Sequence, residues 1–186
     1  KLDLFGEDKS NTEIIGNGSV NVIEINATNV NISHFTIKNS GSTKNNAIIK
    51  VEKGKSIITD NKIENGYHGI LLNNSNYHLI YDNYILDNNG DGIRIINSDL
   101  NKNISYNTID GNINGIYLYS SQLNDIYNNK IKNNEGHGIF LNKSCHDTEI
   151  KQNNISNNDL NGIYLNDYSN LSIISKNKVF NNGWSG

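Results

Sequence analysis

A carboxylate, a guanidinium and two imidazoles in this sequence could together carry out chemistry on a sugar chain. Asp91 and Arg94, the only arginine, lie three positions apart. His68 and His137 precede equivalent glycines, one repeat unit before and two units after Asp91. A carboxylate beside cationic and imidazole groups could bond hydroxyls or transfer a proton. Asp91, Arg94 and His137 are therefore the candidate catalytic residues. We favour the alternative interpretation, that these side chains are neighbours on the surface by chance.

Catalysis is not the favoured interpretation, because glycosidic bonds are normally hydrolysed by a pair of carboxylates. The repeat places Asn114 beneath His137, and Asp91 beneath Asn114. A polar residue that opens a strand therefore explains His137 more simply.

Other reactive or metal-binding arrangements are not supported. Ser144, Cys145, His146 and Asp147 are consecutive in a turn, whereas catalytic groups usually converge from separate segments. The five histidines and single cysteine show no H-x-H or C-x-x-C spacing, so we expect no metal and no cofactor.

One row of side chains could instead bind a ligand. Successive units place an outward residue after Gly-Ile, and aromatic rings on a sheet can stack on sugars or dock a protein. Ordinary stacking between neighbouring strands is the competing interpretation. The row consists of Leu71, Arg94, Tyr117, Phe140 and Tyr164, and Tyr119 lies two residues beyond Tyr117. We expect Arg94, Tyr117, Tyr119, Phe140 and Tyr164 to form the ligand-binding surface.

A repeat must position these side chains. Gly-Ile-x-Leu/Ile begins at positions 69, 92, 115, 138 and 162, at intervals of 23, 23, 23 and 24 residues. A second half of the form Ile-x-x-Asn-x-Ile (or Val) follows each time. A period of this length indicates a solenoid. We predict an all-β, right-handed, single-stranded parallel β-helix of about seven coils, each of 22–24 residues, because right-handed connections between parallel strands are strongly favoured.

Stacking of the units predicts continuous rows along the rod. Alternation within a strand turns the Ile and the Leu/Ile of Gly-Ile-x-Leu/Ile inward. The second half adds a strand with two more inward aliphatic residues. Its asparagines should form an internal ladder at a corner, in which each amide bonds the coils above and below. The ladder residues are Asn83, Asn107, Asn129, Asn153 and Asn177, and Asn61 extends the row.

The pattern decays toward the N-terminus. Residues 46–186 are regular, whereas residues 1–45 form irregular coils in which Phe35 replaces the ladder asparagine. We expect residues 1–186 to be a single β-helix domain. Lys1 is not a native start, and Gly186 falls where another unit would begin, so the chain is expected to be part of a longer protein or to pair at its end.

Composition limits the partners. The net charge is −3 and charge runs are absent, so nucleic acid is not expected. No apolar run approaches the roughly 20 residues of a membrane span. Sequons occur at several turns, and the glycosylation candidates are Asn73, Asn103, Asn142 and Asn170.

These repeats resemble the parallel β-helix repeat family, and most closely its NosD-type group. The stretch from Asn129-Lys130-Ile131 through Gly138-Ile139-Phe140-Leu141 to Ser144 is one full instance of that pattern. The resemblance is strong over about residues 46–186 and weak over 12–45. It implies the fold but not one activity, because related proteins include carbohydrate-binding proteins, hydrolases, lyases, epimerases, a periplasmic protein of copper-site maturation and adhesin-like surface proteins.

The enzymatic members differ from this chain at decisive positions. Gly136-His137-Gly138 resembles the G-H-G of polygalacturonases, but their paired aspartates and R-I-K motif are missing. The D-P-H motif of alginate epimerases is also absent. We therefore expect a non-catalytic, extracellular or cell-surface scaffold, adhesin-like, that presents a face to a glycan or a surface protein. A polysaccharide lyase or hydrolase, and a module that self-associates end to end through open coils, are the alternatives.

Overall fold

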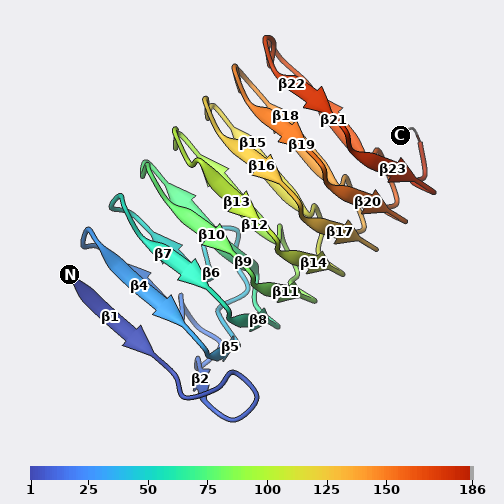
Figure 1. The fold of residues 1–186 in the computed structure, drawn as a ribbon. Helices are drawn as coiled ribbons and strands as arrows, with labels where there is room; N and C mark the ends of the chain where they lie inside the picture. The colour runs from blue at the N-terminus through green and yellow to red at the C-terminus, as the bar shows by residue number, and fades with distance from the viewer. Residues whose placement is uncertain (185–186) are drawn as a thin grey trace.

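The computed structural model describes residues 1–184, which form a parallel β-solenoid without helices (Figure 1). Each strand pairs in parallel with the equivalent strand of the next coil, giving two sheets of eight strands and one of seven. The predicted all-β solenoid of about seven coils is confirmed. Because no helix occurs among the described residues, none of them forms a membrane-spanning helix. Gly186 lies outside the described residues.

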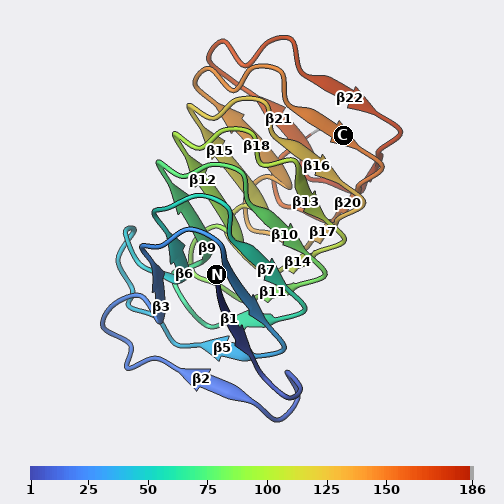
Figure 2. The ribbon, with the colours of Figure 1, turned by 60° about the vertical axis from the view of Figure 1, so that its left-hand side comes forward.

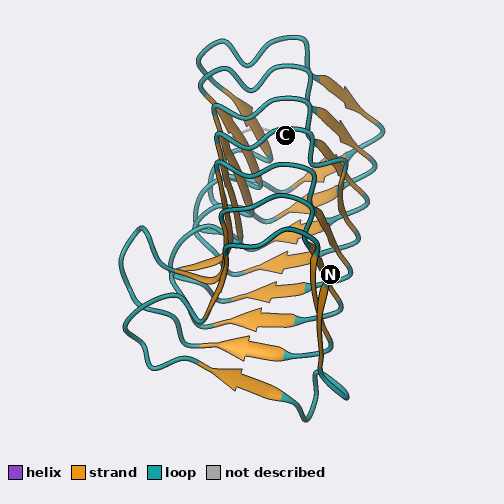
Figure 3. Ribbon diagram, turned by 90° about the vertical axis from the view of Figure 1, so that its left-hand side faces the viewer, coloured by secondary structure: helices purple, strands orange, loops and turns teal. Residues whose placement is uncertain are grey.

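The three sheets surround the interior on three sides (Figure 3). Sheet A consists of β1 (Leu2–Phe5), β4 (Val30–Ser33), β7 (Ile57–Thr59), β10 (Leu79–Tyr81), β13 (Asn103–Ser105), β16 (Asp125–Tyr127), β19 (Glu149–Lys151) and β22 (Ile173–Ser175). Sheet B consists of β2 (Glu13–Ile15), β5 (Thr36–Lys38), β8 (Lys62–Glu64), β11 (Tyr84–Leu86), β14 (Thr108–Asp110), β17 (Lys130–Lys132), β20 (Asn154–Ser156) and β23 (Lys178–Phe180). Sheet C consists of β3 (Ile23–Ile25), β6 (Ala47–Val51), β9 (His68–Asn73), β12 (Ile93–Ile96), β15 (Ile116–Tyr119), β18 (Ile139–Asn142) and β21 (Ile163–Leu165).

The second half of each repeat forms two strands rather than the one expected. In the fourth coil, β10 ends at Tyr81 and β11 begins at Tyr84, with Asp82 and Asn83 between them. Asp82 has φ of 56°, in the left-handed region, which turns the chain sharply within two residues. The equivalent residues Tyr106 and Asn128 have φ of 55° and 57°, so one left-handed residue makes this corner in successive coils.

The N-terminal coils follow the same plan with longer connections. Leu2–Phe5 forms β1, a strand that was not predicted, and it pairs with β4. Glu13–Ile15 forms β2 and pairs with β5, within the region expected to be irregular. The connection between β5 and β6 extends beyond the regular outline of the coils (Figure 2).

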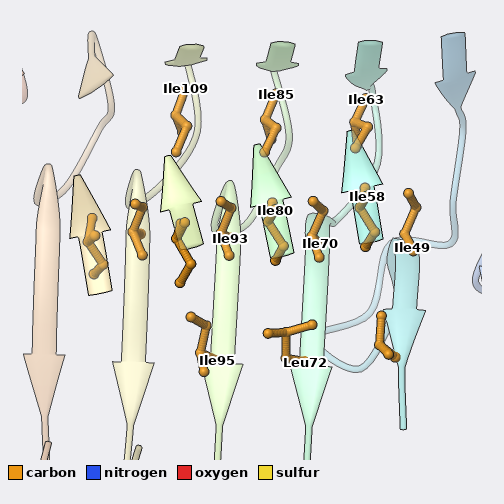
Figure 4. Packing of buried hydrophobic residues seen from close by; sticks show 14 of the residues in the cluster. Ile49, Ile58, Ile63, Ile70, Leu72, Ile80, Ile85, Ile93, Ile95 and Ile109 are labelled. Carbon is orange, nitrogen blue, oxygen red and sulfur yellow. The ribbon is translucent and has the colours of Figure 1, made fainter. Parts of the chain in front are cut away.

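The interior is filled by aliphatic rows that run from coil to coil. Ile70 pairs with Ile93 and Leu72 with Ile95, and all four side chains are completely buried. Figure 4 shows these residues at matching heights on neighbouring strands, with Ile58 and Ile80 facing them from sheet A. The predicted inward rows are therefore confirmed through the regular coils.

The asparagine ladder is also confirmed. Asn83 donates its Nδ2 hydrogen to Oδ1 of Asn107 at 3.0 Å and to the carbonyl of Ile58 at 2.9 Å, so it bonds the coils on both sides. The backbone N–H of Asn83 also donates to Oδ1 of Asn107, at 3.1 Å. Asn61 begins the row, and its Oδ1 accepts the N–H of Phe35. These bonds satisfy corner groups that would otherwise be buried without partners.

Further ladders, which the sequence analysis missed, occupy the other corners. One follows sheet B, where the N–H of Asn112 donates to Oδ1 of Asn134 at 3.0 Å; its members are Asn88, Asn112, Asn134, Asn158 and Asn182. Another follows sheet C and includes His78, whose N–H donates to Oδ1 of Asn101 at 2.9 Å. The Nδ1 atom of His78 accepts the N–H of Ser56 at 3.1 Å. Burial lowers the pKa of His78 to about 4.

The last described coil exposes apolar side chains. Ile174 of β22 is 48% exposed, whereas Ile150, its partner in the preceding coil, is completely buried. Leu165 and Val179 line an open hollow of about 330 Å³ at the same end.

Truncation of an inward residue should destabilise the rod. Ile116 is completely buried, so Ile116→Ala should lower the free energy of unfolding by about 2–5 kcal/mol. Chemical denaturation measures this loss. Ile113→Ala is the matched control, because Ile113 is 37% exposed. A loss below about half a kcal/mol at position 116 would contradict the inward assignment.

Removal of one ladder amide should leave its neighbours unpaired. Asn129→Ala removes the acceptor of two bonds from Asn107 and the donor to Asn153, at an expected cost of about 1–3 kcal/mol. Equilibrium unfolding in urea would give the value. Asn154→Ala changes an exposed asparagine of the adjacent coil, and an equal loss in both variants would argue against the ladder.

Acid should destabilise the solenoid through His78. Its folded-state pKa of about 4 lies below the ordinary value of 6.5, so the unfolded chain binds more protons between these pH values. Stability from this group is present above pH 6.5 and falls by about 3 kcal/mol as the pH drops to 4. His78→Asn, which copies Asn101 one coil along, should flatten this part of the stability–pH curve measured by denaturation. Identical curves would refute the assignment.

Candidate functional site

The outer side of sheet C, here called the sheet C face, carries the predicted row in register. Arg94 pairs with Leu71 and Tyr117, and Phe140 pairs with Tyr117 and Tyr164. Exposure of the side chains is greatest at the C-terminal end of the row. Leu71 is 4% exposed and Tyr117 9%, Arg94 and Phe140 are half-buried, and Tyr164 is 37% exposed. The row is therefore continuous, but only its C-terminal end offers an open aromatic ring.

The aromatic rings of the row pack mainly against one another. Tyr117 and Phe140 are 5.1 Å apart edge to face, and Phe140 and Tyr164 are 5.0 Å apart with tilted planes. The guanidinium of Arg94 lies 4.5 Å from the centroid of Tyr117. Such contacts contribute about 0.5–1.5 kcal/mol each, so the expected stacking between strands is present. Tyr119 lies outside this stack, and its hydroxyl is 3.0 Å from Nζ of Lys143.

A polar column borders the row, formed by the residues that precede the glycines of Gly-Ile: His68, Asp91, Asn114, His137 and Asn161. The N–H of Asp91 donates to Nδ1 of His68 at 2.9 Å, and the N–H of His137 donates to Oδ1 of Asn114 at 2.9 Å. The N–H of Asn161 donates to Nδ1 of His137 at 3.2 Å. This column, here called the pre-glycine column, links coils in the same way as the asparagine ladders.

Glycine beside this column allows the coils to close. A Cβ atom at position 115 would lie 2.4 Å from Cγ2 of Ile131 and 2.5 Å from the carbonyl oxygen of Gly138. Any larger residue would push sheet B or the next coil away. The glycine of each Gly-Ile thus brings the pre-glycine column against the coil interior.

The structure brings three of the four candidate polar residues together. Nη1 of Arg94 donates to Oδ2 of Asp91 at 2.6 Å, and Nδ1 of His68 lies 3.7 Å from the same oxygen. Nδ2 of Asn114 donates to Oδ1 of Asp91 at 2.8 Å. Both carboxylate oxygens are therefore engaged in a side chain that is only 4% exposed. His137 does not join this group, because Asn114 lies between it and Asp91 in the column.

The two histidines of the column hold neighbouring parts of the face. Nε2 of His68 is 3.2 Å from the carbonyl oxygen of Lys44, in the connection before β6. The ring of His137 stacks on Tyr164 at 4.8 Å and packs against Phe140 at 4.9 Å. Burial lowers the pKa of both rings, although the Asp91 carboxylate partly offsets this for His68.

A hollow of about 460 Å³ lies on the sheet C face beside Arg94. Its lining combines hydrogen-bond donors with two apolar side chains: Lys44, Asn45, Lys50, Leu71, Asn73, Arg94 and Ile96. Lys44 is exposed, whereas Lys50 is paired with Glu52 at 2.8 Å. Lys44, Asn45 and Lys50 were not among the predicted site residues. Lys50 could have been found, because it occupies the same outward row one coil before Leu71.

Cys145 is completely buried, burial raises the pKa of its thiol, and its N–H donates to Ser169, so it occupies a ladder position. Among residues 1–184, no group of His, Cys, Asp or Glu side chains is arranged to hold a metal ion.

The glycosylation candidates differ in accessibility. Asn170 is exposed. Asn73, Asn103 and Asn142 are half-buried, and Nδ2 of Asn142 donates to the Tyr117 hydroxyl at 3.0 Å. Asn103 accepts a hydrogen bond from the hydroxyl of Tyr127. Asn170 is thus the most open of the four.

Comparison with known proteins supports the architecture. A family profile described as a right-handed β-helix region matches residues 21–182. The chain belongs to the right-handed β-helix family. No curated protein sequence matches this β-helix.

Among solved structures, the β-helix is similar to the A-module of a mannuronan C-5 epimerase from Azotobacter vinelandii. The similarity has a TM-score of 0.43 at 13% sequence identity. It covers 88% of this chain but only 59% of that module.

Proposed function

We propose that this β-helix is a non-catalytic module of an extracellular or cell-surface protein, and that it binds a glycan along the sheet C face. The observation that carries the proposal is the hollow beside Arg94, which continues in register into the aromatic row. Lys44, Lys50 and Arg94 offer cationic donors there. Carboxylate or hydroxyl oxygens of a sugar chain would accept from them.

The shape of the face favours an extended ligand. Leu71 and Ile96 provide an apolar floor, and the amides of Asn45 and Asn73 can both donate and accept. Tyr164, at the other end of the row, presents an exposed ring that could stack on a sugar. Such a combination of apolar surface and placed polar groups is typical of ligand sites.

The state of Asp91 supports binding rather than catalysis. Its carboxylate accepts from Arg94 and Asn114, so a proton-transfer role would require breaking these bonds. The resemblance to NosD-type and adhesin-like repeats, and the exposed sequon at Asn170, support the surface location.

End-to-end self-association is the second candidate. The inward side chain of Ile174 is exposed on the last described coil, and a second copy stacked there would cover it. Light scattering over a range of protein concentrations would detect this association. A monomer at high concentration would count against it.

Variants of the face test glycan binding. Lys44→Glu and Tyr164→Ala change accessible residues. Tyr117 is packed between Arg94 and Phe140, so its substitution would disturb the fold. Titration calorimetry against neutral, carboxylated and sulfated oligosaccharides should show about tenfold weaker binding for each variant. Lys130→Glu, on the exposed side of sheet B, is the matched control and should bind normally.

Three results would overturn the proposal. The wild-type chain could bind no oligosaccharide, or Lys44→Glu and Tyr164→Ala could both retain full affinity. Turnover of uronic-acid polymers that is lost in Asp91→Ala or His137→Ala would favour a lyase or hydrolase instead.

A further inference from the structure

The two histidines of the sheet C face serve as hydrogen-bond acceptors in contacts between coils. Nδ1 of His68 accepts the N–H of Asp91 at 2.9 Å, and Nδ1 of His137 accepts the N–H of Asn161 at 3.2 Å. A ring nitrogen can accept only while it carries no proton. Protonation at either Nδ1 would place a donor against a backbone donor.

The tautomer of His68 follows from its two contacts. Because Nδ1 accepts, the hydrogen of the neutral ring is on Nε2, which can donate to the carbonyl of Lys44 at 3.2 Å. His68 therefore joins the connection before β6 to the sheet. That connection supplies Lys44 and Asn45 to the hollow. A change at His68 would reach the wall of the proposed binding site directly.

His137 has the corresponding position in the aromatic part of the face. Its ring lies nearly parallel to Tyr164, with 20° between the planes, and it also packs against Phe140. If the ring left its acceptor position to find a new partner, Tyr164 would lose the surface it stacks on. His68 thus stabilises the end of the sheet C face near the hollow, and His137 stabilises the aromatic end.

Neighbouring charges have opposite effects on the protonation of His68, and no charged side chain within residues 1–184 is paired with His137. The Asp91 carboxylate favours a charged His68, whereas burial and the Arg94 guanidinium oppose it. The Tyr67 ring packs edge-on against the imidazole of His68 at 4.7 Å. Burial has the largest effect, and it lowers the pKa of His68. Around His137 the packed groups are Phe140, Tyr164 and Asn114, and none of the ion pairs among the described residues involves it. Burial lowers its pKa as well.

We propose that the sheet C face is acid-sensitive: it keeps its shape while His68 and His137 are neutral, opens when they take up protons, and then releases a ligand bound there. The release rests on the proposed glycan binding, whereas the opening does not. An opened face frees the rings, whose ordinary pKa is about 6.5. The open form therefore binds more protons, and it gains population as the pH falls below that value.

The test variants replace each histidine with asparagine, a residue that the pre-glycine column already contains. Asn114 occupies the same column and accepts the N–H of His137 through Oδ1. His68→Asn and His137→Asn should keep these acceptors without a titrating group. His34→Asn is the control, because His34 is exposed and bonds Ser33 rather than the column.

Amide NMR between pH 7.5 and 5 tests the opening without a ligand. In the wild type, the amide signals of Asp91 and Asn161 should shift or broaden as their acceptors are protonated. Those of Asn83 and Asn107, which donate to asparagine side chains, should stay in place and report an intact rod. His34→Asn should behave like the wild type, and the double variant H68N/H137N should lose the response. Unchanged Asp91 and Asn161 signals in the wild type, or an equal response in the double variant, would overturn the proposal.

Affinity for a uronic-acid oligosaccharide tests the release. Binding by the wild type should weaken about tenfold or more from pH 7.5 to 5, and by less than about threefold in the double variant. Equal weakening in both would overturn the release. If the wild type does not bind at pH 7.5, the proposed function fails for this probe, and the NMR experiment still decides whether the face opens.

Discussion

Backbone and side-chain polar groups at the corners of a solenoid must find partners without water, and this requirement determines which residues the chain can use. Each coil turns within one or two residues, so corner N–H groups face the interior. Asn83 and its equivalents satisfy them: Oδ1 of Asn83 accepts the N–H of Asn61 in the preceding coil, and its Nδ2 donates to both neighbouring coils. Among the described residues, only Ser56 Oγ and His146 Nδ1 are buried side-chain atoms without a partner. An unpaired buried group costs about 1–3 kcal/mol, so a rod with unfilled corners would not be stable.

The same requirement leaves room for variation at the pre-glycine column. Histidine, aspartate and asparagine all offer an acceptor at this place, and the column contains all three. Asp91 can therefore hold Arg94 over the sheet C face, and His137 can support Tyr164, without loss of the links between coils. The chemical character of the face is set by which acceptor each coil uses, while the aliphatic interior stays constant.

Much of the architecture could be predicted, because equivalent positions of successive repeat units have the same residue type. The inward rows, the first asparagine ladder and the register of Arg94 with Tyr117 all follow from spacing. The split of the second half-coil at Asp82 does not, since different residue types, Asp82, Tyr106 and Asn128, occupy the left-handed position in successive coils. The contribution of Lys44 and Asn45 to the hollow was also missed, because the connection before β6 departs from the repeat. Irregular segments form part of the wall of the candidate site, and their conformation cannot be predicted from the repeat.

The hydrogen bonds that join the coils connect residues only about one repeat apart in sequence, for example 22 between Asn61 and Asn83 and 24 between Asn83 and Asn107. Each coil therefore interacts only with its immediate neighbours. The free energy of unfolding of a coil is approximately the sum of an intrinsic contribution and the contributions of its two interfaces. Such a rod behaves thermodynamically as a short one-dimensional chain. An outer coil can fray while the middle stays ordered, and a whole coil could be inserted or deleted with less disruption than a single residue inside a strand.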